Sequence, residues 1–355
     1  MTDTDNLVRF DNQVAGHDRL LRFSTNDMII VKPCTLKELA FYEASHRYPD
    51  FQEWIPECYG SLRASSDSEL RLLNEQQQYE NDVTQLPSEL IVDPARHVEN
   101  NLCLENVLRG FTKPCILDVK IGRKLCDETA DEDKRKRMEE RAKSTTTHSI
   151  ALRICGMKTF NAVNGMQTIY SKTYGRSLVK DDILDGFLAY FFPSSDYAHK
   201  ASKHSDVVAE NVAEVATEGI SARIPGKMMR WILESFQDDL SDMRDFIATH
   251  SNLQLISSSL LFVYEGDQKA AESVWKRMLQ EDEQAEQTSS VPVTDDDNEE
   301  DEEDVSKICD VRLIDFAHSK WDASQEQQDP GLLEGFDNMI GILQECIRRQ
   351  RAQKL

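Results

Sequence analysis

The chain has 355 residues and a formal net charge of −23, and this length suits two lobes or domains with a substantial shared core. No apolar stretch approaches the roughly 18 residues of a transmembrane helix, and the N-terminus lacks the apolar run of a signal peptide. We therefore expect no integral membrane association and no secretion, which leaves the cytoplasm and the nucleus. The eight cysteines include no CxxC pair, which argues against a zinc site or a disulfide framework.

The charge is distributed unevenly along the chain. From Leu279 to Asp304, thirteen residues are Asp or Glu and none is Lys or Arg. Like charges repel and this segment has little apolar surface to bury, so we expect a disordered acidic loop at about residues 281–305. The excess of negative charge also argues against direct binding to nucleic acid.

The first predicted elements are a strand over residues 28–33 (MIIVKP) and a helix over residues 35–47. Thr35 and Glu38 form a capping-box pattern at the start of that helix. A strand lysine such as Lys32, followed by a helix with glutamates, is how the small lobe of a kinase holds ATP phosphates. A solvated lysine at a strand end is the alternative interpretation.

Three further segments in the first half of the chain have patterns that predict their structure. Residues 61–89 are polar and aperiodic, which indicates a surface insertion. Residues 102–111 (LCLENVLRGF) predict a short strand that runs into a polar stop. Residues 123–149 predict a charged helical insertion.

The string PCILDVKIG (114–122) predicts a strand with chemistry on one face. Alternation places the carboxylate of Asp118 and the ammonium of Lys120 side by side on that face, together with Ile116. The opposite face carries Cys115, Leu117, Val119 and Ile121. A surface ion pair, contributing at most about 1 kcal/mol, is the alternative explanation for Asp118 and Lys120.

The basic run KRKRMEERAK begins at Lys134 and contains six basic residues in ten. On a helix Lys134, Arg137 and Arg141 share one face, and three cations on one face can bind several phosphates. A nuclear import signal, or a solvated face paired with nearby acidic residues, would explain the same run.

The second half of the chain predicts one long helix and two strands. Residues 227–250 carry an apolar stripe at three- and four-residue spacing, which indicates a core helix. Residues 256–266 (ISSSLLFVYEG) predict a strand, and VRLID predicts another that ends in Asp315. A carboxylate at a strand end is a common ligand for Mg²⁺ against nucleotide phosphates. His318 follows one turn later.

Three of these strings carry a family resemblance. PCILDVKIG, SSSLL (257–261) and IDFAHS (314–319) resemble the PxxxDxKxG, SSLL and DFA signatures of the inositol polyphosphate kinases, and the flanking sequence most resembles the fungal multikinases of that family. The resemblance implies an α+β, two-lobed kinase-like fold. It has an N-terminal lobe (1–106) with an antiparallel sheet, and a larger C-terminal lobe (107–355) that carries the small helical substrate-binding insertion.

The resemblance also implies an activity. This is ATP- and Mg²⁺-dependent phosphorylation of inositol 1,4,5-trisphosphate at the 6- and 3-hydroxyls, giving the tetrakis- and pentakisphosphates. An inositol hexakisphosphate kinase remains an alternative, as does a nuclear scaffold whose acidic loop binds transcription factors. A protein kinase is disfavoured because the HRD, DFG and GxGxxG motifs are absent.

The family's functional positions fall on specific residues of this chain. The resemblance implies nucleotide binding by Lys32, Glu105, Val107, Asp118 and Asp315, with Asp315 also the metal ligand. It places Glu105 and Val107 at the hinge between the lobes, where their backbone groups would meet the adenine edge. It implies catalytic roles for Asp118 and Lys120. It implies substrate binding by Lys120, Lys134, Arg137, Met138, Arg141, Lys172 and His318. Met138 departs from the polar residue expected at its position.

Overall fold

The structure of the chain, a computed structural model, describes residues 7–15, 20–63, 100–203, 207–208, 223–288 and 305–355. The N-terminal part forms a five-stranded antiparallel sheet in the order β1–β2–β3–β5–β4. Its strands are β1 (Leu7–Arg9), β2 (Leu21–Phe23), β3 (Asn26–Cys34), β4 (Cys58–Arg63) and β5 (Asn100–Glu105). The strands predicted at 28–33 and 102–111 are thus β3 and β5. Most of the predicted 61–89 insertion lies outside the described residues.

Two helices accompany this sheet, α1 (Leu36–Ser45) and α2 (Pro49–Gln52). Thr35 caps α1 as predicted, since its hydroxyl accepts a hydrogen bond from the Glu38 N–H. The reciprocal half of the capping box does not form. The Glu38 carboxylate instead accepts from Lys32 and from the Phe316 N–H, because it is buried at the junction with the second sheet.

The larger C-terminal part is built on a six-stranded antiparallel sheet in the order β12–β11–β6–β7–β8–β9. Its strands are β6 (Pro114–Ile121), β7 (Leu152–Asn161), β8 (Met166–Tyr170), β9 (Val207–Val208), β11 (Ser259–Glu265) and β12 (Cys309–Ile314). The alternation predicted for β6 is confirmed, because Cys115, Leu117, Val119 and Ile121 belong to the hydrophobic core. A mixed chain of helices and antiparallel sheets confirms the α+β class.

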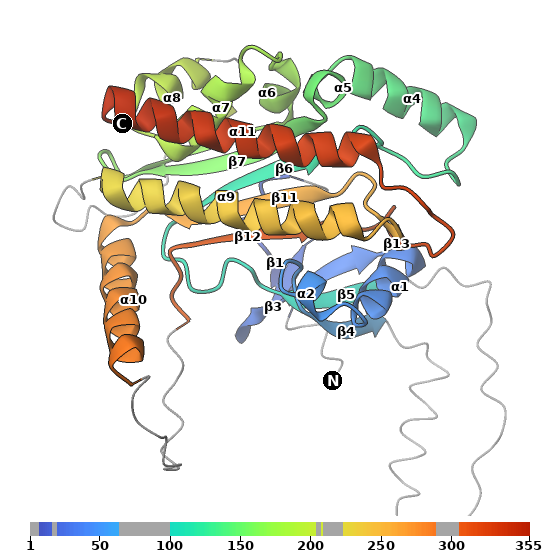
Figure 1. Ribbon diagram of the computed structural model, residues 1–355, viewed down its shortest axis with the longest axis horizontal. Helices are drawn as coiled ribbons and strands as arrows, with labels where there is room; N and C mark the ends of the chain where they lie inside the picture. The colour runs from blue at the N-terminus through green and yellow to red at the C-terminus, as the bar shows by residue number, and fades with distance from the viewer. Residues whose placement is uncertain (1–6, 16–19, 64–99, 204–206, 209–222, 289–304) are drawn as a thin grey trace, which may run out of the picture.

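Helices α9 (Gly226–Thr249) and α11 (Pro330–Gln353) lie side by side across one face of this sheet (Figure 1). The stripe predicted over residues 227–250 is confirmed, since its apolar members are buried along α9. The predicted insertion contains α4 (Glu132–Lys143) and α5 (Thr146–Ile150). The remaining elements of this part are α6 (Lys172–Ser177), α7 (Ile183–Phe191), α8 (Asp196–Ala201) and the small pair β10 (Leu253–Gln254) and β13 (Lys320–Trp321).

The acidic segment begins later than expected. Helix α10 (Gln268–Thr288) projects from the body (Figure 1) and continues through residues 281–288, so an unstructured loop starting at 281 is wrong. Glu, Gln and Ala are strong helix formers, which favours a helix over this part of the sequence. Residues 289–304 lie outside the described residues.

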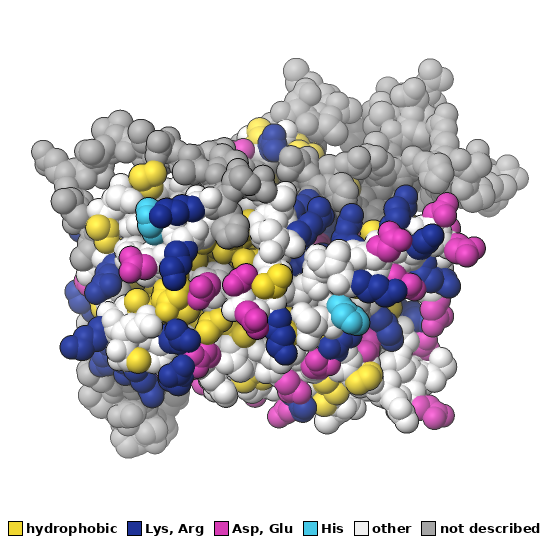
Figure 2. Space-filling model, turned by 90° about the horizontal axis from the view of Figure 1, so that it is seen from above, with side chains coloured by type: hydrophobic (Ala, Val, Ile, Leu, Met, Phe, Trp, Pro, Cys, Tyr) yellow, Lys and Arg dark blue, Asp and Glu magenta, His cyan; other side chains and the backbone are white. Residues whose placement is uncertain are grey.

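Two broader surface properties follow from the described ranges. None of the helices within them is both long and apolar enough to cross a membrane. On the face seen from above, Lys and Arg side chains are interspersed with Asp and Glu (Figure 2). The excess negative charge of the chain is therefore not concentrated on the described part of this face.

The two lobes meet where the residues after α2 contact β12. The Leu313 N–H donates to the Trp54 carbonyl at 2.7 Å, and the Arg312 guanidinium donates to the Glu53 and Ile55 carbonyls at 2.9 and 3.3 Å. The end of β12 is thereby fixed against the N-terminal lobe. This contact determines where the residues after β12 lie.

Candidate active site

A cleft of about 980 Å³ lies between the two lobes. Its walls come from β3, β5 and α1 on one side and from β6, β11 and the residues after β12 on the other. Seven of the predicted site residues line it: Lys32, Glu105, Val107, Asp118, Lys120, Asp315 and His318. Residues far apart in the sequence therefore converge on one cleft.

Lys32 is held between two carboxylates in this cleft. Its Nζ donates to Glu38 at 2.8 Å and to Asp315 at 2.7 Å. Burial alone would lower the pKa of Lys32, but the negative charges of Asp315 and Glu38 hold that pKa above its ordinary value. Lys32 is thus a fixed cation, and the interpretation of a merely solvated lysine does not describe it.

Asp315 follows the last residue of β12 and has a φ of 65°. This left-handed conformation is uncommon for residues other than glycine, with Asp and Asn the most tolerant. Asp315 follows directly on β12, which is fixed against the N-terminal lobe. In this left-handed conformation its carboxylate reaches Lys32.

Asp118 and Lys120 project from β6 into the cleft, as the strand alternation predicts. Asp118 is buried, and its Oδ1 has no hydrogen-bond partner among the described residues. Burial and then the negative charge of Asp315 raise the pKa of Asp118 to about 6, although Lys120 opposes the shift. The Lys120 ammonium donates to the carbonyl of Ser257.

The pair of carboxylates formed by Asp118 and Asp315 fits a hard divalent cation. Mg²⁺ is bound in proteins by one or two carboxylates, and it completes its shell with water and substrate phosphates. No cluster of three or more potential metal-ligating side chains occurs among the described residues. A cation at this position would therefore depend on oxygens from a nucleotide, and it would also satisfy the buried Asp118 Oδ1.

The predicted hinge segment lies at the end of β5. The Glu105 N–H already donates to the Glu57 carbonyl at 2.8 Å, so we expect Glu105 to meet an adenine through its carbonyl. No described residue accepts a hydrogen bond from the Val107 N–H. The Glu105 carbonyl and the Val107 N–H are therefore the two backbone groups that we expect to meet the adenine edge.

A short N-terminal segment covers part of the cleft. Asn12, Gln13, Val14 and Ala15 line it, and Val14 passes over Gly156 of β7. A Cβ on Gly156 would lie 2.0 Å from the Val14 carbonyl oxygen, so only glycine permits this approach. Gly156 is paired in register with Asp118, which places this segment above the carboxylates.

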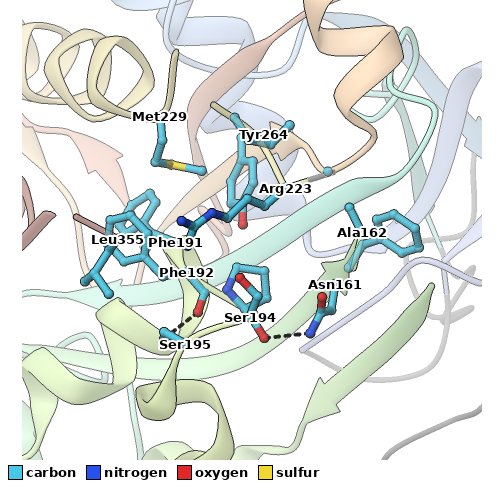
Figure 3. A pocket seen from close by; sticks show the side chains of 14 residues that line it. Asn161, Ala162, Phe191, Phe192, Ser194, Ser195, Arg223, Met229, Tyr264 and Leu355 are labelled. Atoms are coloured by element: carbon cyan, nitrogen blue, oxygen red, sulfur yellow. Dashed lines mark hydrogen bonds between the residues drawn. The ribbon is translucent and has the colours of Figure 1, made fainter. Parts of the chain in front are cut away.

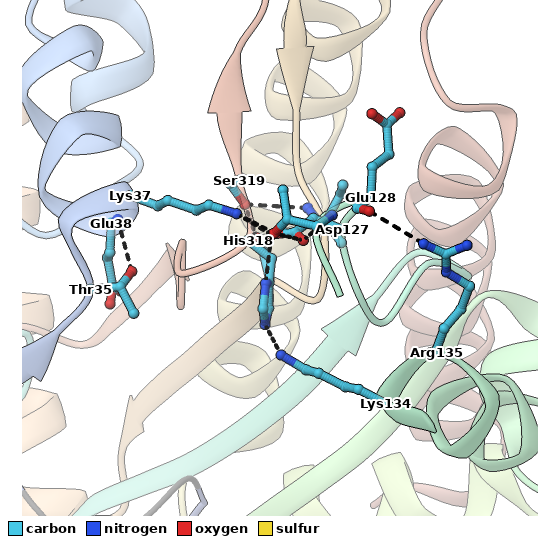
Figure 4. Close-up of polar contacts among 12 residues, drawn as sticks. Thr35, Lys37, Glu38, Asp127, Glu128, Lys134, Arg135, His318 and Ser319 are labelled. Carbon is cyan, nitrogen blue, oxygen red and sulfur yellow. Dashed lines mark hydrogen bonds and ion pairs between the residues drawn. The ribbon is translucent and has the colours of Figure 1, made fainter. Parts of the chain in front are cut away.

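Helix α4 meets the cleft at His318. Lys134 lies 3.5 Å from His318 Nε2, measured from its Nζ, and Asp127 lies 3.0 Å from His318 Nδ1, measured from its Oδ2 (Figure 4). Of the predicted residues on α4, Lys134 and Met138 are half-buried, whereas Arg137 and Arg141 are exposed. Met138 thus lies four residues, about one turn, after Lys134 on the same half-buried face.

Two arginines that the sequence analysis did not identify join the basic face. Partial burial and then the positive charges of Arg176, Arg153 and Arg137 lower the pKa of Arg141. Arg153 is buried on β7, directly opposite Lys120 in register, and Arg176 lies on α6. Lys172 begins α6 and is exposed. The residues that line the cleft do not include Lys172, nor do they include the four predicted residues of α4, Lys134, Arg137, Met138 and Arg141.

The residues that were not predicted differ in the signal that the sequence gives for them. Arg153 is a charged residue that interrupts an apolar strand, and this irregularity is a signal in the sequence. Asp127 and Lys37 lie in loop and helix-start positions with no periodic signal. Their contacts with each other depend on how the lobes pack.

A second pocket lies elsewhere, around Phe191, Phe192, Met229 and Leu355 (Figure 3). Of the described residues that line it, Arg223 alone has a charged side chain. The lining side chains include no carboxylate and no lysine, so they lack the groups that the proposed phosphate chemistry uses.

The chain is similar in sequence and in fold to known proteins. The model of the family described as "Inositol polyphosphate kinase" matches residues 101–218 and 206–344. The chain is 29% identical over 259 residues to the inositol polyphosphate multikinase of Schizosaccharomyces pombe, across 73% of this chain and 80% of that protein. It is 26% identical over 250 residues to inositol hexakisphosphate kinase 3 of Homo sapiens, across 69% of this chain and 50% of that protein. The crystal structure of the inositol phosphate multikinase of S. cerevisiae in complex with ADP and Mn²⁺ matches with a TM-score of 0.55 and 25% identity, and covers 90% of this chain and 98% of that one.

Proposed function

The chain belongs to the inositol polyphosphate kinase family, and we propose that it is a multikinase that transfers phosphate from ATP to inositol 1,4,5-trisphosphate, at the 6- and 3-hydroxyls in succession. The observation that carries the proposal is the arrangement of charge around the cleft. Lys32, Asp118 and Asp315 lie together on one side, and a cluster of arginines and lysines borders it on the α4 side. The first group suits a metal-bound nucleotide, and the second suits an acceptor with several phosphates.

The residues of the first group bind and orient the nucleotide. We assign Lys32 to the nucleotide phosphates, since it is a fixed cation, and Glu105 and Val107 to the adenine edge. Asp315 and Asp118 would hold Mg²⁺, which neutralises charge on the phosphate oxygens when it is bound. The related S. cerevisiae structure is a complex with ADP and Mn²⁺, which supports the use of a nucleotide and a divalent metal ion.

The remaining residues serve the acceptor and the transferred group. Phosphoryl transfer mainly requires positioning and the neutralisation of negative charge. Lys120 lies beside Asp118, where it can approach the transferred phosphoryl group, and Asp118 can also accept a hydrogen bond from the attacking hydroxyl. Lys134, Arg137, Arg141 and His318 would bind the phosphates and hydroxyls of the acceptor.

Product analysis tests the proposal directly. The full chain is incubated with ATP, Mg²⁺ and a panel of inositol phosphates, and the products are assigned by chromatography. We expect the trisphosphate to give a tetrakis- and then a pentakisphosphate, and the Asp315→Asn variant to give neither. Conversion of the hexakisphosphate alone would favour the hexakisphosphate kinases, to which the chain is also similar. Conversion of no inositol phosphate would refute the proposal.

A further inference from the structure

A chain of polar contacts runs from the N-terminal lobe to α4 (Figure 4), and it includes His318, which lines the cleft. Lys37, in the first turn of α1, donates from Nζ to Asp127 Oδ2 at 3.0 Å. The same oxygen lies 3.0 Å from His318 Nδ1, and His318 Nε2 lies 3.5 Å from Lys134 Nζ. The four side chains come from α1, the segment before α4, the segment after β12, and α4 itself.

The Asp127 carboxylate is held firmly in this chain. Its Oδ1 accepts from the Thr129 N–H at 2.9 Å and from the Thr129 hydroxyl at 2.6 Å, and its side chain is 13% exposed. Partial burial opposes ionisation, but the hydrogen bonds from Thr129, His318 and Lys37 lower the pKa of Asp127 below its usual range. Asp127 is therefore a fixed anion beside the imidazole.

These contacts select one form of the His318 ring. A carboxylate can only accept a hydrogen bond, so Nδ1 must carry a proton. An ammonium group can only donate, so Nε2 must offer its lone pair to Lys134. The neutral Nδ1–H tautomer satisfies both neighbours, whereas the Nε2–H tautomer would place acceptor against acceptor on one side and donor against donor on the other.

We propose that Asp127 is a positioning residue, which holds His318 as the Nδ1–H tautomer so that Nε2 and the Lys134 ammonium face the acceptor together. The inference rests on the proposed function for the identity of the acceptor, an inositol polyphosphate. Lys37 and Thr129 keep Asp127 in place, and Lys37 does so from the other lobe. Metal sites use the same arrangement: a neighbouring residue orients the metal-binding histidine by accepting a hydrogen bond from the ring nitrogen that does not bind the metal.

The tautomer can be measured without any substrate. Long-range ¹H–¹⁵N spectra of the histidine rings distinguish the two tautomers, and the His318→Ala variant identifies the signals of His318. We expect the Nδ1–H form in the unaltered chain and loss of that preference in Asp127→Ala. An Nε2–H form in the unaltered chain, or an unchanged Nδ1–H form in Asp127→Ala, would overturn the inference.

Kinetics test whether Asp127 acts through His318. We expect Asp127→Ala to raise KM for inositol trisphosphate roughly 10-fold, with KM for ATP unchanged, and Asp127→Asn to lie between it and the unaltered chain. In a His318→Ala background, Asp127→Ala should raise KM for inositol trisphosphate by less than about a further twofold, because the imidazole that Asp127 positions is already absent. An equal loss in both backgrounds would contradict a positioning role.

Two controls separate this inference from other failures. Glu128→Gln alters the exposed neighbouring carboxylate and should change neither KM nor the tautomer. Thermal unfolding and the affinity for ADP report whether Asp127→Ala has lost its fold. If that variant unfolds, Lys37→Met provides the second test, with a smaller rise in KM for inositol trisphosphate expected and an unchanged KM counting against the inference. If the unaltered chain phosphorylates no inositol phosphate, the proposed function fails, but the ring spectra still decide the role of Asp127.

Discussion

The ammonium of Lys32 lies 2.7 Å from the carboxylate of Asp315 although 283 positions separate them. The second carboxylate on Lys32, that of Glu38, is buried with 2% of its side chain exposed. The cation that we assign to ATP phosphates is thus also the counter-ion of a buried anion. Changes at Lys32 will affect binding and stability together.

Lys32→Met should raise KM for ATP at least about 10-fold, since it removes a fixed charge from the nucleotide phosphates. It should also lower the free energy of unfolding by about 3 kcal/mol, because the buried Glu38 carboxylate is left without a positive charge beside it. Adding Glu38→Gln should restore most of the stability but not the ATP binding. Steady-state kinetics and denaturant unfolding separate the two effects, and recovery of ATP binding in the double variant would contradict the assignment.

Asp315→Asn should reduce kcat by at least about 10²-fold, because it removes a charge that anchors the metal. Asparagine tolerates the left-handed conformation of this position, so the melting temperature should change little. Asp315→Ala should be equally inactive and also less stable by about 1–2 kcal/mol, because alanine is strained at positive φ. Near-normal turnover in the asparagine variant would refute the metal assignment.

Asp118→Asn should abolish turnover and yet stabilise the metal-free protein. Burial raises the pKa of Asp118 from 3.8 to about 6, so its ionised form weakens the fold above about pH 6, and this penalty declines as the pH falls toward 4. At pH 8 this pKa shift corresponds to a loss of about 3 kcal/mol in the free energy of unfolding. Thermal unfolding in the presence of a metal chelator should show Asp118→Asn to be more stable than the unaltered chain at pH 8, with a smaller difference in stability at pH 5. Equal stability of the two proteins at pH 8 would contradict the raised pKa.

Arg137→Ala and Arg141→Ala should each raise KM for inositol trisphosphate about fivefold, the loss expected from about 1 kcal/mol at an exposed charge. KM for ATP should not change. Lys136→Ala is the matched control, because Lys136 is exposed on the same helix but outside the proposed face. Arg135 is a poorer control, since it donates to the Glu128 and Ala130 carbonyls. An equal rise in KM for inositol trisphosphate in Lys136→Ala and Arg137→Ala would mean that the basic run of α4 attracts the acceptor by its overall charge and not through one face.

Periodicity predicted the parts of this structure that depend on local geometry. The alternation of β6 places Asp118 and Lys120 in the cleft, and the stripe of α9 is core, because each pattern follows from the repeat of its own element. The two strands that carry the SSSLL and IDFAHS strings pair with each other, as a hairpin interrupted by an insertion would.

The parts that the sequence did not predict depend on contacts between distant elements. Glu38 fits a capping box locally, but the approach of Phe316 and Lys32 redirects its carboxylate. Arg153 becomes part of the site only because β7 pairs with β6 in a register that sets it opposite Lys120. No pattern within residues 123–131 indicates that Asp127 meets His318, since that contact depends on packing between the insertion and the segment after β12.

The cleft combines segments from opposite ends of the chain, the N-terminal residues around Val14 and the residues that follow β12. During synthesis the N-terminal parts fold first, so Lys32 and Asp118 leave the ribosome long before Asp315 and His318. A product of premature termination shortly before residue 315 would keep Lys32 and Asp118 but lack Asp315, one of the two carboxylates that we assign to the metal. We therefore expect such an unfinished copy to transfer no phosphate.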